Sequence, residues 1–415
     1  MGVNADVDAV PGWMDRRAKE MLLRLVKGVS AGTVSVRDGD GETVCRGAAD
    51  PDFANAAITV RHPSFYRRIL FGGTIGAGEA YMDGLWTCDD LTALVRIVVR
   101  NRQFFTGLDS GLGRLLWPLH QVSHLFRRNS REGSRRNIAA HYDLGNDFFA
   151  LFLDPTMAYS CGYFDTPEST MEEASVSKMD RLCRMLRLVP GDSLLEIGTG
   201  WGALAIHAAR NFGCRVTTTT ISREQHDLAA ERVREAGLAD RITLLLKDYR
   251  DLEGRFDKII SVEMLEAVGH QFYDAFFKKC AGLLNPGGLM ALQTITVNDQ
   301  DYESTTRDVD FIKRYIFPGG QLPSLTAICQ SLTRATDLRV FHLEDISAHY
   351  VTTLLRWRDN FWANVAEIRG LGYSETFLRM WDFYLCLCAG SFAERHTGDV
   401  QMLLAKPGWR PEPTA

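Results

Sequence analysis

The second half of the chain alternates short apolar runs with longer segments whose apolar residues recur at helical spacing. One apolar run ends at Ile197, three glycines follow within 198–202, and helical spacing then resumes. Further segments continue the alternation: 215–221 (strand), 224–236 (helix), 242–247 (strand), 256–262 (strand), 272–284 (helix) and 288–296 (strand). This order predicts an α/β fold with a mostly parallel sheet and helices on both faces.

The first part of the chain has a different pattern. Residues 13–27 carry apolar residues at helical spacing, which predicts an amphipathic helix packed on a core. Alternating runs at 32–36, 42–45 and 57–60, separated by Asp-Gly and Gly-Asp turns, predict a small antiparallel sheet. Glycines interrupt the apolar and aromatic segment 65–86 too often for a stable helix throughout. That segment either carries a binding surface or folds tightly against the core.

Residues 112–136 combine apolar residues at helical spacing with clustered arginines. A surface-lying, lipid-binding helix has this composition, and so does a core helix followed by a solvated linker. The sequence Ser-Arg-Glu-Gly-Ser within it is typical of a flexible joint. We therefore expect a smaller α+β or helical domain at 1–129 that associates with lipid or membrane, a linker at 130–136 and a larger α/β domain at 137–415.

Composition narrows the class of protein. The 415 residues are 46% hydrophobic and 24% charged, as in an ordinary folded protein of two domains, and the net charge of -5 argues against a nucleic-acid binder. The nine cysteines are scattered, which fits a reduced, intracellular setting. The acidic start does not resemble a signal peptide, and no apolar run approaches the ~20 residues that cross a bilayer. We expect a soluble or peripheral protein.

Ligands of parallel sheets collect at the carboxyl ends of the strands. Polar residues and glycines gather at the expected strand ends: Glu196 to Gly202, Thr220, Asp248 and Tyr249, Glu263 to Glu266, and Gln293 to Ile295. Glycines in the first of these turns let a ligand lie against bare backbone. The spacing differs from Gly-x-Gly-x-x-Gly and an acidic residue precedes the turn, which favours a methyl donor such as S-adenosylmethionine over NAD. A turn whose glycines only permit close packing is the alternative.

Two carboxylates, Glu263 and Glu266, follow the strand that is expected to end at Val262. Their spacing of three residues places both on one side of a helical turn. One of them is suited to hold a base or a cation while the other is solvated. For Glu263 we expect a solvent-facing helix start.

Several motifs in one order carry a family resemblance. They are the polar and aromatic stretch 136–161, Leu195-Glu-Ile-Gly-Thr-Gly-Trp-Gly202, Thr220-Ile-Ser-Arg-Glu-Gln225, Asp248-Tyr-Arg-Asp-Leu252 and Tyr315-Ile-Phe-Pro-Gly-Gly-Gln-Leu-Pro-Ser324. Together they resemble the cyclopropane-fatty-acyl-phospholipid synthases, a family that includes mycolic acid cyclopropane synthases. Residues 76–86 resemble the amino-terminal domain of these enzymes, so the resemblance covers roughly residues 60–405.

The resemblance implies a Rossmann-like class I methyltransferase fold that transfers a methylene group from S-adenosylmethionine to cis double bonds of phospholipid acyl chains. It assigns the methyl donor to Tyr159, Ser160, Glu196, Gly198, Thr199, Gly200, Trp201, Gly202, Thr220, Gln225, Asp248 and Tyr249. It also implies a bicarbonate ion as base, held by Cys161, Glu266, Gln293, Ile295 and Tyr350. No metal is expected.

The chain departs from the family pattern at two positions. Gln293 stands where well-known bacterial members have histidine, although glutamine also occurs in the wider family, and Ala267 likewise replaces a histidine. An amide hydrogen-bonds bicarbonate but cannot become cationic. We expect Glu266 to orient bicarbonate by accepting its proton, while Tyr350 and Gln293 hydrogen-bond its oxygens.

Cys388 matches a cysteine once proposed as a nucleophile in this family. The chemistry needs no covalent enzyme intermediate, so the thiol is a weak catalytic candidate, and a core cysteine is the favoured interpretation.

Two other functions stay open. A C-methyltransferase that acts on the same lipids would leave a methyl branch or a methylated alkene. A non-catalytic lipid-binding or scaffold protein is the second alternative. It would have a disrupted donor turn, whereas the donor turn of this sequence is intact. We expect a cytoplasmic enzyme associated with the inner face of the membrane, with the bilayer surface and unsaturated acyl chains as partners, no nucleic acid, and a homodimer as a further expectation.

Overall fold

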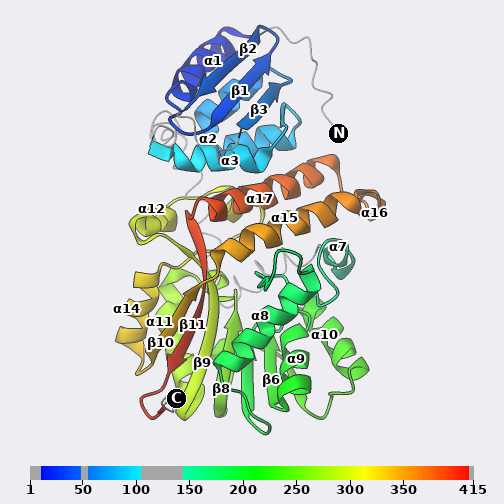
Figure 1. Ribbon diagram of the computed structural model, residues 1–415, viewed down its shortest axis with the longest axis vertical. Coiled ribbons are helices and arrows are strands. Elements are labelled where there is room, and N and C mark those ends of the chain that lie inside the picture. Colours follow the sequence, from blue (N-terminus) through cyan, green and yellow to red (C-terminus); the bar gives the residue numbers. More distant parts are fainter. Residues whose placement is uncertain (1–10, 48–54, 104–143, 411–415) are drawn as a thin grey trace. The chain divides into compact units, whose positions relative to one another are not determined.

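The computed structural model describes residues 11–47, 55–103 and 144–410, and Figure 1 shows their helices and strands. The chain divides into two compact units. The first comprises 1–126, 309–316 and 357–396, and the second 127–308, 317–356 and 397–415. The expected lipid-binding segment 112–136, with its linker, lies outside the described residues. The domain boundaries therefore stay a prediction, although two later segments of the chain group with the first unit.

The second unit is built on a seven-stranded sheet of order β10-β11-β9-β8-β5-β6-β7. The strands are β5 (Ser193–Ile197), β6 (Arg215–Thr220), β7 (Ile242–Leu246), β8 (Phe256–Val262), β9 (Leu284–Val297), β10 (Arg339–Asp345) and β11 (Thr397–Ala405). Strands β5 to β9 pair in parallel, which confirms the predicted mostly parallel sheet. β11 lies between β9 and β10 and runs antiparallel to both.

Helices cover both faces of this sheet (Figure 1). They are α8 (Met171–Met185), α9 (Ala203–Phe212), α10 (Arg223–Glu235), α11 (Tyr273–Leu283) and α14 (Leu325–Ala335). The unit also contains α7 (Asn146–Ala150), α12 (Tyr302–Arg307) and the short 3-10 turns η2 (Tyr249–Asp251), η3 (Leu265–Ala267), η4 (His270–Phe272) and η5 (Asp299–Asp301). Neighbouring strand residues point to opposite faces. Leu195 and Ile259 therefore pack with α11 and α14, whereas Leu194 and Ile260 pack with α8, α9 and α10.

The first unit contains a four-stranded sheet of order β2-β1-β3-β4. Its elements are α1 (Trp13–Val26), β1 (Thr33–Asp38), β2 (Gly41–Arg46), β3 (Asn55–Val60), α2 (Ser64–Met82), β4 (Trp86–Cys88), α3 (Leu91–Arg100), α13 (Phe311–Tyr315), α16 (Val365–Gly370) and α17 (Glu375–Ala393), and α15 (Ser347–Ala363) continues into it from the second unit. The expected antiparallel sheet is only partly correct, because β3 pairs in parallel with β1. Alternation identifies strands but carries no information on their direction.

Two buried carboxylates connect the late segment 357–396 to the first unit. Glu394 accepts hydrogen bonds from Arg96 (2.8 Å) and Arg100 (2.6 Å) of α3. Asp382 on α17 accepts from the Tyr81 hydroxyl of α2 at 2.7 Å. All three bonds are charge-assisted and therefore stronger than neutral ones. They help to explain why residues so late in the chain belong to this unit.

The glycine-rich segment is not one uninterrupted helix, which confirms the expectation drawn from its glycines. α2 spans it with one break at Gly73, whose φ of 53° is available to glycine at little cost. A Cβ on Gly76 would lie 2.0 Å from the Arg68 carbonyl oxygen, and one on Gly78 would lie 2.5 Å from the Phe311 ring. Of the two alternatives for this segment, the structure therefore supports tight folding against the core.

None of the helices in the described ranges has the length and apolar character of a membrane span.

Gly76→Ala should destabilise the protein by about 1–3 kcal/mol, because the added methyl overlaps backbone. Gly72→Ala is the matched control in the same helix. A Cβ there meets no described atom within 4 Å, so alanine should be neutral or stabilise by up to ~1 kcal/mol. Thermal unfolding followed by circular dichroism measures both variants, and equal melting temperatures would contradict the packing role of Gly76.

Candidate active site

The glycine turn between β5 and α9 is held by backbone hydrogen bonds. The amides of Gly198 and Thr199 both donate to the Thr219 carbonyl of β6 at 3.1 Å. Gly198, Gly200 and Gly202 all have positive φ, of 103°, 52° and 88°. A Cβ on Gly200 would meet no described atom within 4 Å, whereas one on Gly198 would lie 3.4 Å from Met264. The backbone at Gly200 is therefore open to an approaching ligand.

The polar residues predicted for the methyl donor follow β6 and β7 at the same edge. The Thr220 hydroxyl donates to Gln225 Oε1 at 2.9 Å, and both residues are buried. Asp248, at the start of η2, holds the Arg250 guanidinium at 2.6 Å. Tyr249 packs edge-on against a buried phenylalanine, and burial raises the pKa of its hydroxyl to about 12. These side chains, fixed by hydrogen bonds and packing, form a polar edge beside the turn.

Aromatic rings gather at the predicted donor residues Tyr159 and Trp201. The Tyr159 ring lies 5.4 Å from Phe149 and 6.4 Å from Phe317, measured between ring centroids. Trp201, inside the glycine turn, lies 5.0 Å from Phe149. Its indole N–H donates to Asn146 Oδ1 at 2.7 Å. Aromatic faces attract cations, so this cluster suits a sulfonium ligand.

A buried lysine that the sequence pattern did not single out lies beside the predicted donor residue Ser160. Lys178 Nζ on α8 donates to the Ser160 hydroxyl at 2.6 Å, and burial lowers the pKa of this lysine. Burial raises the pKa of Glu196, at the end of β5, to about 8, although the Thr218 hydroxyl donates to its carboxyl at 2.5 Å. Lys178 faces away from solvent, and helical spacing alone did not distinguish it from a surface lysine.

Glu263 is the residue for which the sequence interpretation was wrong. It does not start a solvent-facing helix, because its carboxyl oxygens accept hydrogen bonds from three separate segments. The Cys161 amide donates to Oε1 at 2.8 Å, Gln293 Nε2 donates to Oε1 at 2.9 Å, and the Tyr350 hydroxyl donates to Oε2 at 2.6 Å. The three donors are themselves buried. Glu263 therefore lies at the centre of the polar site.

Glu266 is oriented by β9. Its Oε1 accepts hydrogen bonds from the Thr294 hydroxyl at 2.9 Å and from the Ile295 amide. Its Oε2 is buried and has no hydrogen-bond partner among the described residues. Burial, and next the charge of Glu263, raise the pKa of Glu266 to about 8. Its pKa is therefore raised, whereas we expected this carboxyl to accept the proton of bicarbonate.

Two further polar residues of the site come from β11. Gln293 Nε2 also donates to Asp399 Oδ2 at 3.1 Å, and Gln401 Nε2 donates to Gln293 Oε1 at 3.0 Å. Asp399 is fully buried; burial, and next the charges of Glu263 and Glu266, raise the pKa of Asp399 well above its ordinary value. In the sequence, Asp399 and Gln401 are recognisable only as two polar residues, two positions apart, within an otherwise apolar strand.

The two cysteines singled out from the sequence have different positions. Cys161 contributes its backbone N–H to Glu263, while its thiol is buried and has a pKa well above the ordinary value because of burial. Cys388 lies on α17 in the first unit, and burial raises the pKa of its thiol. A thiol that is hard to ionise is a poor nucleophile. The catalytic role of Cys388 stays a weak prediction.

The donors that the resemblance assigns to bicarbonate are engaged by this chain's own carboxylates. Cys161, Gln293 and Tyr350 donate to Glu263, and Ile295 donates to Glu266. A separate bicarbonate ion held by these same donors does not fit this arrangement. The described residues also contain no group of three or more His, Cys, Asp or Glu that is able to hold a metal ion.

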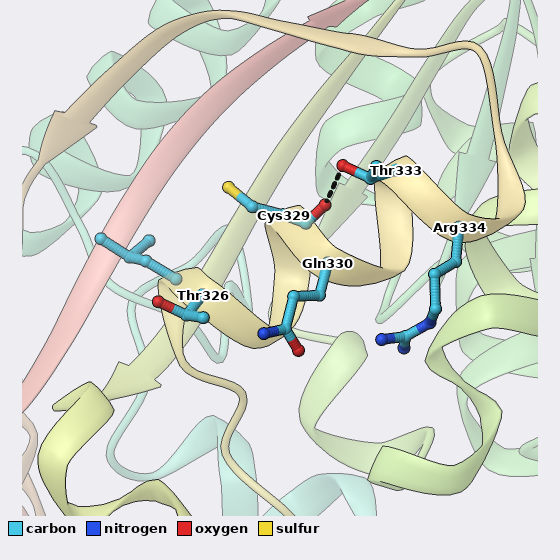
Figure 2. Close-up of a pocket in the computed structure, with 6 residues that line it drawn as sticks. Thr326, Cys329, Gln330, Thr333 and Arg334 are labelled. Atoms are coloured by element: carbon cyan, nitrogen blue, oxygen red, sulfur yellow. Dashed lines mark hydrogen bonds between the residues drawn. The ribbon is translucent and has the colours of Figure 1, made fainter.

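A surface pocket of the same unit lies apart from these residues, on α14 (Figure 2). It is lined by Leu325, Thr326, Cys329, Gln330, Thr333 and Arg334. Every one of these side chains comes from a single helix, and Thr333 donates back to the Cys329 carbonyl at 2.9 Å. The pocket contains no residue of the predicted site.

Comparison with known proteins supplies the family. The model of a family described as mycolic acid cyclopropane synthetase matches residues 129–402. The chain belongs to this family. It is 40% identical over 84% of its length to the cyclopropane-fatty-acyl-phospholipid synthase of Escherichia coli K12, 87% of which is covered. It is also 38% identical over 95% of its length to the tuberculostearic acid methyltransferase UfaA1 of Mycobacterium tuberculosis, 90% of which is covered.

Solved structures agree with this family. The mycolic acid cyclopropane synthase CmaA1, complexed with SAH and CTAB, matches with a TM-score of 0.62 and 33% identity over 66% of this chain and 98% of that one. The present chain is therefore an S-adenosylmethionine-dependent methyltransferase with the predicted α/β fold. The roles of individual site residues stay predictions.

Gly200→Ala should weaken S-adenosylmethionine binding at least about tenfold, a loss of roughly 1.4 kcal/mol, because the methyl enters the space above the turn. Gly237→Ala is the matched control, since Gly237 also has positive φ (68°) and open space at its Cβ but follows α10. Both variants carry similar backbone strain. Calorimetric titration with S-adenosylmethionine should show weaker binding for Gly200→Ala alone, and equal affinities would contradict the role of Gly200.

Glu266→Gln should change the pH dependence of stability. The folded pKa of Glu266, about 8, lies above its ordinary value of 4.5, so folding retains a proton that the unfolded chain loses. The resulting stability is fully present below pH 4.5 and is lost as pH rises through 8. Between these values wild type should therefore lose stability relative to Glu266→Gln, with a slope of up to about 1.4 kcal/mol per pH unit.

Urea unfolding at several pH values measures this difference. Glu253→Gln is the control, because Glu253 is an exposed glutamate of the same unit. Parallel stability curves for wild type and Glu266→Gln would contradict the raised pKa.

Proposed function

We propose that this enzyme transfers a one-carbon unit from S-adenosylmethionine to the cis double bond of unsaturated acyl chains in phospholipids and closes a cyclopropane ring. The observation that carries the proposal is the carboxylate of Glu263, which is held by three donors. Glu263 directly precedes Met264, whose side chain would lie 3.4 Å from a Cβ on Gly198 in the donor turn. A methyltransferase that acts on an alkene must remove a proton from carbon, and a fixed carboxylate beside the donor supplies a base. The 40% identity to the E. coli synthase supports the same reaction.

An alkene is a weak nucleophile, so its double bond must lie in line with the sulfonium methyl. Positioning of this kind accounts for much of the rate of such reactions. The turn at Gly200 and the polar residues after β6 and β7 would hold the donor, which supplies an electrophilic methyl group. The aromatic cluster at Tyr159 would exclude water and stabilise the cation that forms on the acyl chain.

Loss of one proton from the transferred methyl then closes the ring. The electron pair of the broken C–H bond forms the third bond of the cyclopropane, and the base takes the proton. Every charge is balanced, because the donor leaves as the neutral sulfide.

A second product is favoured by a specific observation, the 38% identity to the tuberculostearic acid methyltransferase UfaA1 over 95% of this chain. Loss of a proton from a carbon of the acyl chain, instead of from the new methyl, gives a methylated alkene. The substrate, the donor and the cation are the same in both reactions. The two reactions differ only in which hydrogen the base removes.

The substrate places the enzyme at a bilayer surface. We propose that it acts on acyl chains from the inner face of the membrane as a peripheral protein.

Expression in a bacterial host that lacks such an enzyme tests this function. Phospholipid acyl chains should gain one CH2 unit per modified double bond, and the product should resist mild hydrogenation, since a ring does so and an alkene does not. Mass spectrometry before and after hydrogenation distinguishes the two products. Unmodified acyl chains, from an enzyme that binds S-adenosylmethionine in calorimetry, would contradict both.

A further inference from the structure

We infer that the carboxylate of Glu263 is the general base of this enzyme and takes the place that its relatives are expected to give to bicarbonate. The inference rests on the proposed function and deepens it. It assigns to a residue of the chain a task that the family resemblance assigns to a diffusible ion.

The hydrogen bonds that Glu263 accepts are the first observation in support of this inference. A bicarbonate anion is planar, has a single negative charge and presents oxygens to surrounding donors, and a carboxylate has the same properties. The Cys161 amide, the Gln293 amide and the Tyr350 hydroxyl all point at the oxygens of Glu263, at 2.8, 2.9 and 2.6 Å. These three groups are among the five that the resemblance assigns to bicarbonate. The same donors therefore hold an anion that is covalently part of the chain.

The backbone of Glu263 supports the same conclusion. Its amide donates to the Gln293 carbonyl at 2.8 Å and extends the pairing of β8 with β9 by one residue. Its φ is 47°, in the left-handed region that favours glycine and costs other residues free energy. Such a conformation persists only where surrounding contacts impose it, and it is common at active sites. Here it directs the carboxylate toward the three donors.

The neighbouring carboxyls differ from Glu263 in their hydrogen bonds. Both oxygens of Glu263 accept hydrogen bonds from donors, an arrangement that favours the charged form. Glu266 Oε2 and Asp399 Oδ1 are buried without a hydrogen-bond partner among the described residues, an arrangement suited to protonated carboxyls. Lys178, also buried, supplies a positive charge that interacts with Glu263. Of these three carboxyls, Glu263 is therefore the one whose two oxygens both accept hydrogen bonds from donors of the chain.

The step that Glu263 performs is a single proton transfer. The π electron pair of the alkene forms a bond to the methyl carbon, while the sulfur–carbon bond breaks and its electron pair stays on sulfur. The carboxylate of Glu263 then takes one proton from the cationic product. The electron pair of that C–H bond forms the ring or the new alkene. Glu263 becomes a neutral acid and returns its proton to water before the next turnover.

Wild-type enzyme gives the first test. In carbon dioxide-free buffer under argon, product formation from phospholipid vesicles should be unchanged when tens of millimolar bicarbonate replace an equal concentration of chloride. Stimulation of the wild-type rate by bicarbonate would overturn the inference.

Two substitutions at the same position provide the matched comparison. Glu263→Gly removes the carboxylate and suits the left-handed backbone, so it should lose about 100-fold or more in rate without bicarbonate and regain activity when bicarbonate enters the vacated place. Glu263→Gln fills the same place without a base and should stay inactive in both buffers. A Glu263→Gly variant that works at the wild-type rate without bicarbonate would overturn the inference.

A readout without turnover separates this inference from the proposed function. Bicarbonate, compared with chloride, should raise the melting temperature of Glu263→Gly by mass action and leave wild type and Glu263→Gln unchanged. This comparison holds even if wild type modifies no phospholipid, which would contradict the proposed function alone. A bicarbonate-dependent rise in the melting temperature of wild type would show that Glu263 does not occupy the anion site.

Discussion

The hydrogen bonds to the carboxylate of Glu263 hold together three segments that are distant in the sequence. Cys161 precedes the sheet, Gln293 lies within β9 and Tyr350 lies on α15. Each donor is buried, and a buried donor left without a partner costs roughly 1–3 kcal/mol. The same backbone that carries the Cys161 amide also carries Tyr159 and Ser160, two residues predicted to hold the methyl donor. The carboxylate therefore couples the geometry of the donor site to that of the base.

Strands β5 and β9 were predictable because they are mostly buried and contain continuous apolar runs. β5, β6, β8 and the helices between them agree with the expected ranges to within about two residues, the usual uncertainty of element ends. β10 and β11 were not predicted; β11 lies between β9 and β10 and runs antiparallel to both, outside the parallel order that the alternation of strands and helices predicted. In α2 the glycines correctly predicted an interruption, which lies at Gly73, although the chain is helical on both sides of it. Helix propensity is a weak local preference, and the tight contact at Gly76 outweighs it.

Residues of the glycine turn were predictable because positive φ and an open backbone restrict the choice of side chain. Glu263 was not, because two glutamates three residues apart carry the same local signal. Their difference arises from partners supplied by other strands and by α15. Asp399 and Gln401 depend in the same way on the pairing of β11 with β9. Local sequence identifies where a ligand can approach, whereas which carboxyl is ionised depends on contacts that exist only in the folded chain.

A base fixed in the chain has a consequence for the product. A diffusible ion can turn within its site, but three donors and a left-handed backbone restrict the carboxylate of Glu263 to one orientation. Ring closure requires the base to reach a hydrogen of the transferred methyl, and alkene formation requires a hydrogen of the acyl chain itself. These hydrogens lie on different carbon atoms, so a base with one orientation discriminates between them by geometry. The choice between the two products therefore depends on how the acyl chain lies against Glu263, and residues that shape the acyl-chain site control the outcome as strongly as the base does.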